Sequence, residues 1–256
     1  MSTEPALAGR VAVVTGASGR LGPVWIEALA AAGATGAGVD LRPGTVAGAT
    51  VVAADVTDRP ALDAARAQIE SELGPPTVLV NSAGIDQPPD AAASTFRIED
   101  VPLADFRATL DVNLVGAFNA LQVFGSSMRD AGGGSIVNIG SLYATIAAEP
   151  RFYDHLDVDP PFLKPAAYGA SKAGLLNLTR YFARLWGPSN VRVNALSPGG
   201  VAGGQDPEFV RKYRERVPLD RLAEPSDLGG PLVFLASDAS AYVTGHELRV
   251  DGGFTA

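Results

Sequence analysis

The sequence contains no cysteine and only two histidines, His155 and His246, among 256 residues. Without thiols the chain has no disulfide bond, no thiolate metal site and no cysteine nucleophile, although this leaves the compartment open. Two histidines so far apart in the sequence do not suggest a histidine metal cluster. We therefore expect no metal site.

The chain also lacks a basic surplus and a long apolar run. Its formal net charge of −8 argues against nucleic acid as a partner, because phosphates would be repelled. No apolar run approaches the ~20 residues that span a bilayer. The opening segment MSTEPALAGR has an acid, a proline and no apolar core, so we expect neither a signal peptide nor a membrane partner. The expected location is the cytoplasm.

What is present is an ordinary globular composition, 46% hydrophobic and 19% charged. Length and composition predict one domain over residues 1–256. Short apolar runs alternate with helical patterns along the whole chain. They predict strands at 10–15, 35–40, 50–54, 77–81, 134–140, 191–196 and 247–250, and helices at 21–32, 60–73, 103–128, 167–186 and 226–236.

This alternation predicts an α/β fold, a Rossmann-type doubly wound parallel sheet of about seven strands with helices on both faces. Ligands of such sheets bind beyond the carboxyl ends of the strands. Thr15, Asp40, Asn81 and Ser141 all fall at those ends. We therefore expect these residues to share one site.

Three glycines, Gly16, Gly19 and Gly22, lie in the turn between the first strand and the first helix. Glycines permit a tight turn and a close approach of the backbone to a pyrophosphate at a helix N-terminus. Asp40 ends the second strand at about the spacing of an acid that binds an adenosine ribose. Each feature alone is common in loops, but together they predict a dinucleotide site.

Tyr168 and Lys172 are one helical turn apart in the stretch YGASK. Such a pair alone is usually two neighbours on a helix face. A strand-end serine such as Ser141 or a helical asparagine such as Asn113 is also usually structural. The order of glycine loop, Asn113, Ser141, Tyr168 and Lys172 in one chain favours a catalytic set.

On these motifs the chain resembles the short-chain dehydrogenase/reductase family along nearly its whole length. The resemblance implies that Tyr168 is the acid/base, that Lys172 and the cofactor lower its pKa from about 10, that Ser141 orients the carbonyl, and that Asn113 belongs to a water relay. The matching motifs are TGASGRLG (Thr15 to Gly22), Asp55-Val56, NSAG (Asn81 to Gly84), Asn113, Ser141, YGASK, SPGG (Ser197 to Gly200) and GHELRVDGG.

The resemblance also implies a nicotinamide cofactor and the residues that bind it. Two departures concern this set: Arg20 interrupts the family's usual TGxxxGxG loop, and the stretch after Pro198 and Gly199 lacks a threonine that holds the nicotinamide carboxamide in many relatives. The backbone of Val201 is the expected substitute. The expected cofactor residues are Gly16, Ser18, Gly19, Arg20, Leu21, Asp40, Leu41, Asp55, Val56, Asn81, Ala83, Gly84, Tyr168, Lys172, Pro198, Gly199 and Val201.

Asp40 favours NAD over NADP, because its carboxylate would face the extra phosphate. Two unit charges about 4 Å apart repel by ~4 kcal/mol at an effective dielectric constant of about 20, and solvent screening lowers this. Arg42 could fold over a phosphate, so NADP stays an alternative.

The separation of Ser141 from Tyr168 is about a dozen residues longer than in relatives, which predicts an insertion at 144–166. Its aromatic and charged side chains suit a lid over a polyhydroxylated or acidic small molecule, and a proline-rich surface loop is equally compatible. A second candidate lid is 201–218, whose charged run RKYRER is typical of a solvated helix face. The candidate substrate residues are Tyr143, Arg151, Tyr153, His155, Lys164 and Gln205.

The leading hypothesis is a nicotinamide-dependent oxidoreductase that interconverts a secondary alcohol and a ketone on a small polar substrate, such as a sugar, a polyol or a sugar acid. The alternatives are a 3-oxoacyl-thioester ketoreductase and a cofactor-binding sensor without turnover, against which the complete catalytic set argues. Relatives are commonly tetramers, so we expect a homotetramer. Leu175, Leu178, Phe182 and Leu185 would serve its interface or the core.

Overall fold

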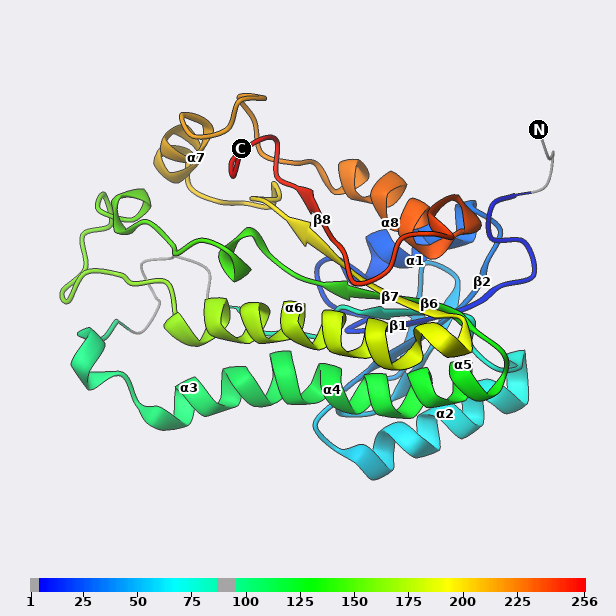
Figure 1. Ribbon diagram of the computed structural model, residues 1–256. Helices are drawn as coiled ribbons and strands as arrows, with labels where there is room; N and C mark the ends of the chain where they lie inside the picture. Colours follow the sequence, from blue (N-terminus) through cyan, green and yellow to red (C-terminus); the bar gives the residue numbers. More distant parts are fainter. Residues whose placement is uncertain (1–4, 87–94) are drawn as a thin grey trace.

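The computed structural model describes residues 5–86 and 95–256, so the first four residues of the opening segment lie outside it. One eight-stranded sheet forms the centre, in the order β3-β4-β2-β1-β5-β6-β7-β8 (Figure 1). All neighbouring strands are parallel except β3 and β4. The strands are β1 (Val11–Thr15), β2 (Thr35–Asp40), β3 (Gly44–Val46), β4 (Ala49–Ala53), β5 (Val78–Asn81), β6 (Gly134–Ile139), β7 (Val191–Pro198) and β8 (Glu247–Val250).

The predicted Rossmann-type sheet is confirmed, with all seven predicted strands present. The additional strand is β3, which forms an antiparallel hairpin with β4 at the edge of the sheet. The hairpin turns through Ala47 and Gly48, both at positive φ. A three-residue strand with alanine in a left-handed turn position gives almost no signal in the sequence.

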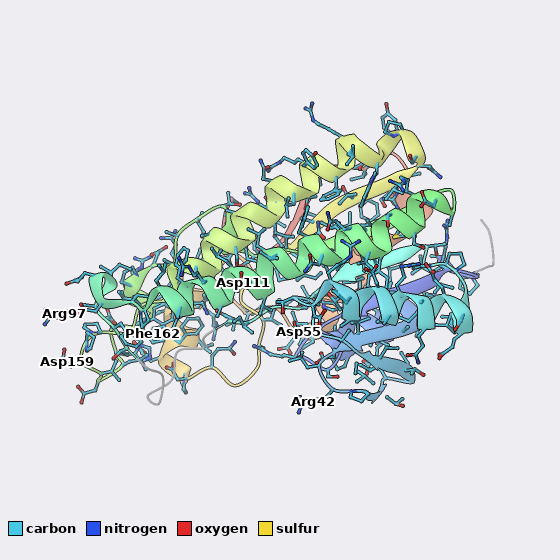
Figure 2. All side chains as sticks on the ribbon, turned by 90° about the horizontal axis from the view of Figure 1, so that it is seen from below. Arg42, Asp55, Arg97, Asp111, Asp159 and Phe162 are labelled. Atoms are coloured by element: carbon cyan, nitrogen blue, oxygen red, sulfur yellow. The ribbon has the colours of Figure 1, made fainter. Side chains whose placement is uncertain are left out.

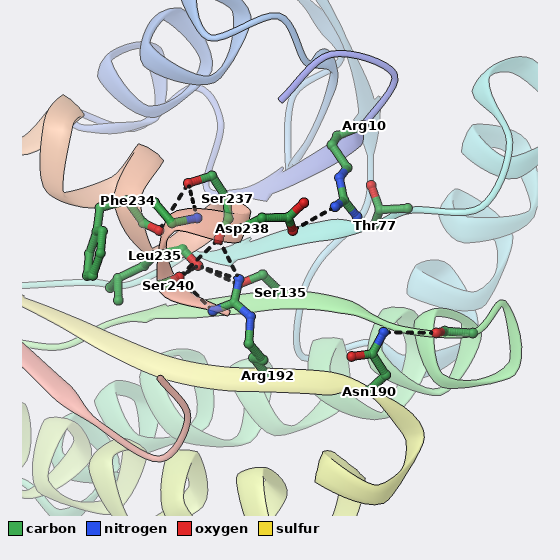
Figure 3. Close-up of polar contacts among 12 residues, drawn as sticks. Arg10, Thr77, Ser135, Asn190, Arg192, Phe234, Leu235, Ser237, Asp238 and Ser240 are labelled. Carbon is green, nitrogen blue, oxygen red and sulfur yellow. Dashed lines mark hydrogen bonds and ion pairs between the residues drawn. The ribbon is translucent and has the colours of Figure 1, made fainter. Parts of the chain in front are cut away.

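Helices cover both faces of the sheet (Figure 1). α1 (Gly22–Ala31) and α8 (Gly229–Ala236) pack on one face, and α2 (Arg59–Leu73) and α6 (Ala166–Trp186) on the other. Arg192 on β7 donates to the carbonyl oxygens of Leu235 and Ser237, both at 3.0 Å, and so holds the end of α8 against the sheet (Figure 3). None of the helices in the described part of the chain has the length and apolarity needed to span a bilayer.

The helix predicted at 103–128 is present and carries two π-helical turns. Its α-helical parts are α3 (Leu103–Leu110), α4 (Ala117–Ala120) and α5 (Ser126–Asp130), joined by η2 (Asp111–Gly116) and η3 (Leu121–Gly125). Asn113 lies in η2. Such turns shift the helical register and are frequent at functional sites.

Strand order reverses at β1, which lies between β2 and β5. The hydroxyl oxygen of Thr15 at the end of β1 accepts hydrogen bonds from the backbone N–H groups of Ser82 at 3.1 Å and Ala83 at 3.2 Å. This fixes the chain after β5 against the glycine loop at the switch point, where ligands of such sheets bind.

Beyond the carboxyl ends of the strands, residues 142–165, α7 (Pro207–Arg214) and the turn at 251–256 form an aromatic lobe. The Phe152 ring centroid lies 6.2 Å from that of Phe209, 5.8 Å from that of Tyr213 and 6.1 Å from that of Phe254. Figure 2 labels Phe162 and Asp159 in this lobe, away from the sheet. The segment at 144–166 is thus packed around buried rings and is not a loose surface loop.

Candidate active site

A cavity of about 580 Å³ opens at the carboxyl ends of the strands, between the sheet and the aromatic lobe. This size is within the range of small-molecule and cofactor sites. Its walls come from the glycine loop, the ends of β2, β5, β6 and β7, the start of α6, and the lobe. The cavity therefore has a half near the glycine loop and a half under the aromatic rings.

The glycine loop fits a pyrophosphate by shape. Gly16 has φ +69°, and a Cβ there would lie 2.7 Å from the Cα of Ala83. A Cβ at Gly22 would lie 2.2 Å from the carbonyl oxygen of Ala17. Neither position accepts a side chain, and the start of α1 has no side-chain cap. The loop thus offers a helix N-terminus without a capping side chain, which suits an anion.

Asp40 ends β2 at the edge of the same half. Its carboxylate accepts hydrogen bonds from the backbone N–H of Ser18 at 2.9 Å and of Leu41 at 2.8 Å. These bonds fix the carboxylate beside the glycine loop. Arg42 and Asp55 also line the cavity and lie at this end of the sheet (Figure 2).

The structure brings the expected cofactor residues together, with one exception. Asn81 is buried outside the cavity wall, and its amide donates to the Asn138 side chain at 2.8 Å, which in turn donates to Thr179 at 2.9 Å. Asn81 thus ties β5 to β6 and α6, and its contact with the cofactor stays a prediction. The residues that do line the cavity are Gly16, Ser18, Gly19, Arg20, Leu21, Asp40, Leu41, Asp55, Val56, Ala83, Gly84, Tyr168, Lys172, Pro198, Gly199 and Val201.

Ser141, Tyr168 and Lys172 meet where the two halves of the cavity join. α6 carries Tyr168 and Lys172 on one face, and Ser141 follows β6. The Lys172 ammonium donates to the carbonyl oxygen of Ile139 at 2.8 Å and lies 5.8 Å from the centroid of the Tyr168 ring. The arrangement places a hydroxyl, a phenol and a cation around one point of the cavity.

The pKa values at this point describe the protein without the cofactor, which was expected to lower the Tyr168 pKa together with Lys172. Burial raises the pKa of Tyr168 above its usual value and Asp86 raises it further, whereas a hydrogen bond from Ser141 lowers it. Burial lowers the pKa of Lys172 to about 8, against the opposing effect of Asp86. Tyr168 is therefore a neutral phenol at neutral pH in the protein alone, because the desolvated hydroxyl lacks enough positive charge nearby.

Asn113 is fully buried and does not line the cavity. Its side chain binds both backbone groups of Ile85, at 2.7 and 3.0 Å, and donates to the Ser171 hydroxyl at 3.2 Å. The amide therefore fixes the chain next to Asp86 against α6. A role in a water relay stays a prediction, and the side-chain contacts are all with protein groups.

The substrate half holds four of the residues expected there, Tyr143, Tyr153, Lys164 and Gln205. Tyr143 and Tyr153 share a hydrogen bond between their hydroxyls, and burial raises the pKa of both, that of Tyr153 to about 12. These phenols are thus uncharged donors and acceptors. The sequence reasoning missed Asp86, Phe209 and Tyr213.

Two expected substrate residues, Arg151 and His155, do not line the cavity, and their contact with a substrate stays a prediction. Arg151 pairs with Glu149 at 2.6 Å, and its guanidinium lies 5.7 Å from the centroid of the Phe152 ring. His155 bonds Asp206 at 2.8 Å and lies 3.3 Å from the Lys212 ammonium. Both side chains therefore serve contacts within the lobe.

A doubly wound sheet with a glycine loop, a strand-end acid and a Ser-Tyr-Lys set defines a nicotinamide-dependent oxidoreductase. Comparison with known proteins agrees. Residues 27–255 match the model of a family described as enoyl-(acyl carrier protein) reductase. The chain belongs to the short-chain dehydrogenase/reductase family. It is an NAD(P)-dependent oxidoreductase that acts on CH–OH groups.

Several relatives cover nearly the whole chain. A galactitol 2-dehydrogenase (L-tagatose-forming) of Cereibacter sphaeroides is 39% identical, over 97% of this chain and 96% of its own. A D-threitol dehydrogenase of Mycolicibacterium smegmatis is 35% identical, over 97% of this chain and 94% of its own. The crystal structure of a short-chain dehydrogenase from Leptospira borgpetersenii with bound NAD+ has a TM-score of 0.88 at 31% sequence identity. The match covers 100% of this chain and 96% of the Leptospira chain.

Proposed function

We propose that this protein oxidises a secondary alcohol of a neutral polyol with NAD and reduces the matching ketose in the reverse direction. The observation that carries the proposal is the substrate half of the cavity, where phenol hydroxyls and one compensated ion pair surround Tyr168. Such a surface offers many hydrogen bonds and little net charge. The names of the relatives from Cereibacter and Mycolicibacterium support a polyol substrate.

Tyr168 and Ser141 would have separate roles in the reaction. NAD would supply the hydride acceptor. The Tyr168 oxygen, as phenolate, would take the alcohol proton, while the Ser141 hydroxyl would donate a hydrogen bond to the same substrate oxygen as it becomes a carbonyl. Because Tyr168 is neutral in the protein alone, the base would form once a positive charge joins Lys172 beside it.

The ion pair of Asp86 and Lys164 argues for a neutral substrate. The Lys164 ammonium lies 2.6 Å from the Asp86 carboxylate and 5.3 Å from the centroid of the Tyr168 ring. Lys164 is largely buried, and Asp86 is more exposed at the cavity. A substrate carboxylate near Tyr168 would therefore meet a cation already compensated by Asp86, which disfavours the sugar acid among the possible substrates.

Asp86→Asn should shift specificity towards acids, because it removes a carboxylate of the cavity wall that would repel a substrate carboxylate. We expect the ratio of kcat/KM for D-gluconate to that for galactitol to rise about tenfold, which corresponds to about 1.4 kcal/mol. Any change in the Tyr168 pKa affects both substrates and largely cancels in the ratio. Steady-state kinetics at one pH and constant salt measure it.

The matched control is Glu149→Gln, which lies outside the cavity. It breaks the Arg151 pair of equal length and a second pair with Arg216 at 3.2 Å, and it should leave the ratio unchanged. An unchanged ratio in Asp86→Asn, or an equal change in the control, would show that the ion pair of Asp86 and Lys164 does not discriminate between charged and neutral substrates.

NAD is the proposed cofactor because Asp40 is fixed where the ribose hydroxyls would lie. Its two backbone hydrogen bonds hold the carboxylate against the loop, so it has little freedom to move away from a 2′-phosphate. Arg42 lines the same wall and would offset part of the repulsion. The NAD+ bound to the Leptospira neighbour supports this choice.

The remaining expectations are also proposals. We propose one domain, a homotetramer and a cytoplasmic location, where soluble nicotinamide cofactors are available. Among the four helix residues considered for an interface, Leu175 and Phe182 are in the core, Leu178 is partly buried, and Leu185 is exposed next to Tyr181. We also propose that 144–166 is an insertion that closes the substrate half through the aromatic lobe.

A further inference from the structure

Arg20 connects two cavity walls that are far apart in the sequence. Its guanidinium donates to the carbonyl oxygens of Val201 and Ala202, both at 2.6 Å. Arg20 belongs to the glycine loop after β1, and its acceptors belong to the chain after β7. Both Arg20 and Val201 line the cofactor half of the cavity, so the contact crosses its edge.

Gly203 provides the space for this contact. A Cβ at Gly203 would lie 1.9 Å from the Nη2 atom and 2.2 Å from the Cζ atom of Arg20. The backbone of Gly203 is not in the left-handed region, so glycine is needed here for space and not for conformation. The guanidinium thus occupies the volume that a side chain at position 203 would fill.

Gln205 strengthens the same turn. Its side-chain oxygen accepts from the Gly203 N–H at 2.9 Å, and its nitrogen donates to the Val201 carbonyl oxygen at 2.7 Å. The Val201 oxygen therefore receives two donors, one from each side of the cavity edge. The two departures seen in the sequence, Arg20 in the loop and the glycine-rich stretch after Gly199, meet at this point.

We propose that Arg20, Gly203 and Gln205 form a latch that holds residues 199–205 across the cofactor half and slows release of the bound cofactor. The proposal rests on the proposed function for the identity of the cofactor as NAD. Residues 199–201 form one wall of this half, and the glycine loop forms the other. Separating the walls breaks two charge-assisted hydrogen bonds, which are stronger than neutral ones. Arg20 is a positioning residue, since its donors bind the protein.

The latch can be opened from either side. Arg20→Ala removes the donors. Gly203→Ala keeps Arg20 but displaces its guanidinium, which is cheap because the far end of a flexible side chain moves. In the double variant the methyl group at 203 fills space that Arg20 has vacated. We expect each single variant to raise the dissociation rate of NADH about tenfold, and the double variant to raise it no further.

Stopped-flow displacement of NADH, followed by cofactor fluorescence, measures this without turnover. The matched control is Gly230→Ala on α8, where a Cβ meets nothing within 4 Å, and its rate should equal that of the wild type. The two single latch variants should keep the wild-type melting temperature, because Arg20 and Gly203 are at the surface.

Multiplication of the single effects in the double variant would overturn the latch. Faster release in Arg20→Ala with wild-type release in Gly203→Ala would also overturn it, because Arg20 would then contact the cofactor itself. A wild-type protein that does not bind NADH would contradict the proposed function, and the latch with it. Normal binding with unchanged release in both single variants would contradict the latch alone.

Discussion

Tyr168→Phe should lower kcat for alcohol oxidation by about 10³-fold or more while leaving the affinity for NADH unchanged. The substitution removes only the phenol oxygen that takes the alcohol proton. The ring, which helps to form the cavity wall, stays in place. Steady-state rates and direct cofactor titration separate the two effects.

Tyr181→Phe is the matched control, because Tyr181 lies on the same helix with its side chain exposed. It should keep the wild-type kcat. Turnover within a factor of about ten of the wild type in Tyr168→Phe would mean that another group carries the proton.

Phe152→Ala should lower the free energy of unfolding by about 3–5 kcal/mol, a typical cost for deleting a buried aromatic side chain. Phe152 is 1% exposed, and its ring contacts three other rings of the aromatic lobe. Because Phe209 and Tyr213 also line the cavity, the substrate KM should rise as well. Urea denaturation measures the stability.

Leu163→Ala in the same segment is the control, since Leu163 is 38% exposed and should change stability by about 0.5 kcal/mol or less. A loss of equal size in both variants, or none in Phe152→Ala, would show that the lobe does not fold together with the sheet. In that case, replacing residues 144–166 by a short linker would not lower stability. If the lobe packs as in this structure, the same replacement removes Phe152, Tyr153 and Phe162 from the core of the lobe and lowers stability.

The sequence predicted the parts of the fold that depend on local pattern. Continuous apolar strands and glycine stops located all seven predicted strands, and the strand-end rule placed Asp40 and Ser141 in the cavity wall. Thr15 and Asn81 end paired strands at the same edge but do not line the cavity, because the last residue of a strand can face a neighbouring segment instead of the cavity. Asn138, the partner of Asn81, is at the paired position of β6.

Contacts between distant segments were not predictable in the same way. Arg151 and His155 were chosen for charge, but their partners Glu149 and Asp206 decide where they lie. Asp86 could have been found, since it directly follows the predicted strand-end motif NSAG and Ile85. Phe209 and Tyr213 had a weaker signal, an aromatic pair at i, i+4 of which only Tyr213 lies inside the charged run.

The raised pKa of Tyr168 results from burial, which cannot be read from the spacing of residues in the sequence. The expected lowering of the Tyr168 pKa by Lys172 and the cofactor stays a prediction, and in the protein alone desolvation is the largest influence on this pKa. Lys172 is desolvated in the same way, so its charge is less available than the spacing of the two residues suggested.

The most direct test is the initial rate of NAD+ reduction with galactitol, D-threitol and D-gluconate, followed by the absorbance of NADH and repeated with NADP+. We predict turnover of at least one neutral polyol with its ketose as product, a lower kcat/KM for D-gluconate, and a higher kcat/KM with NAD+ than with NADP+. No reduction with any polyol, together with reduction of a 3-oxoacyl thioester, would contradict the account. A clear advantage of NADP+ would show that Arg42 outweighs Asp40.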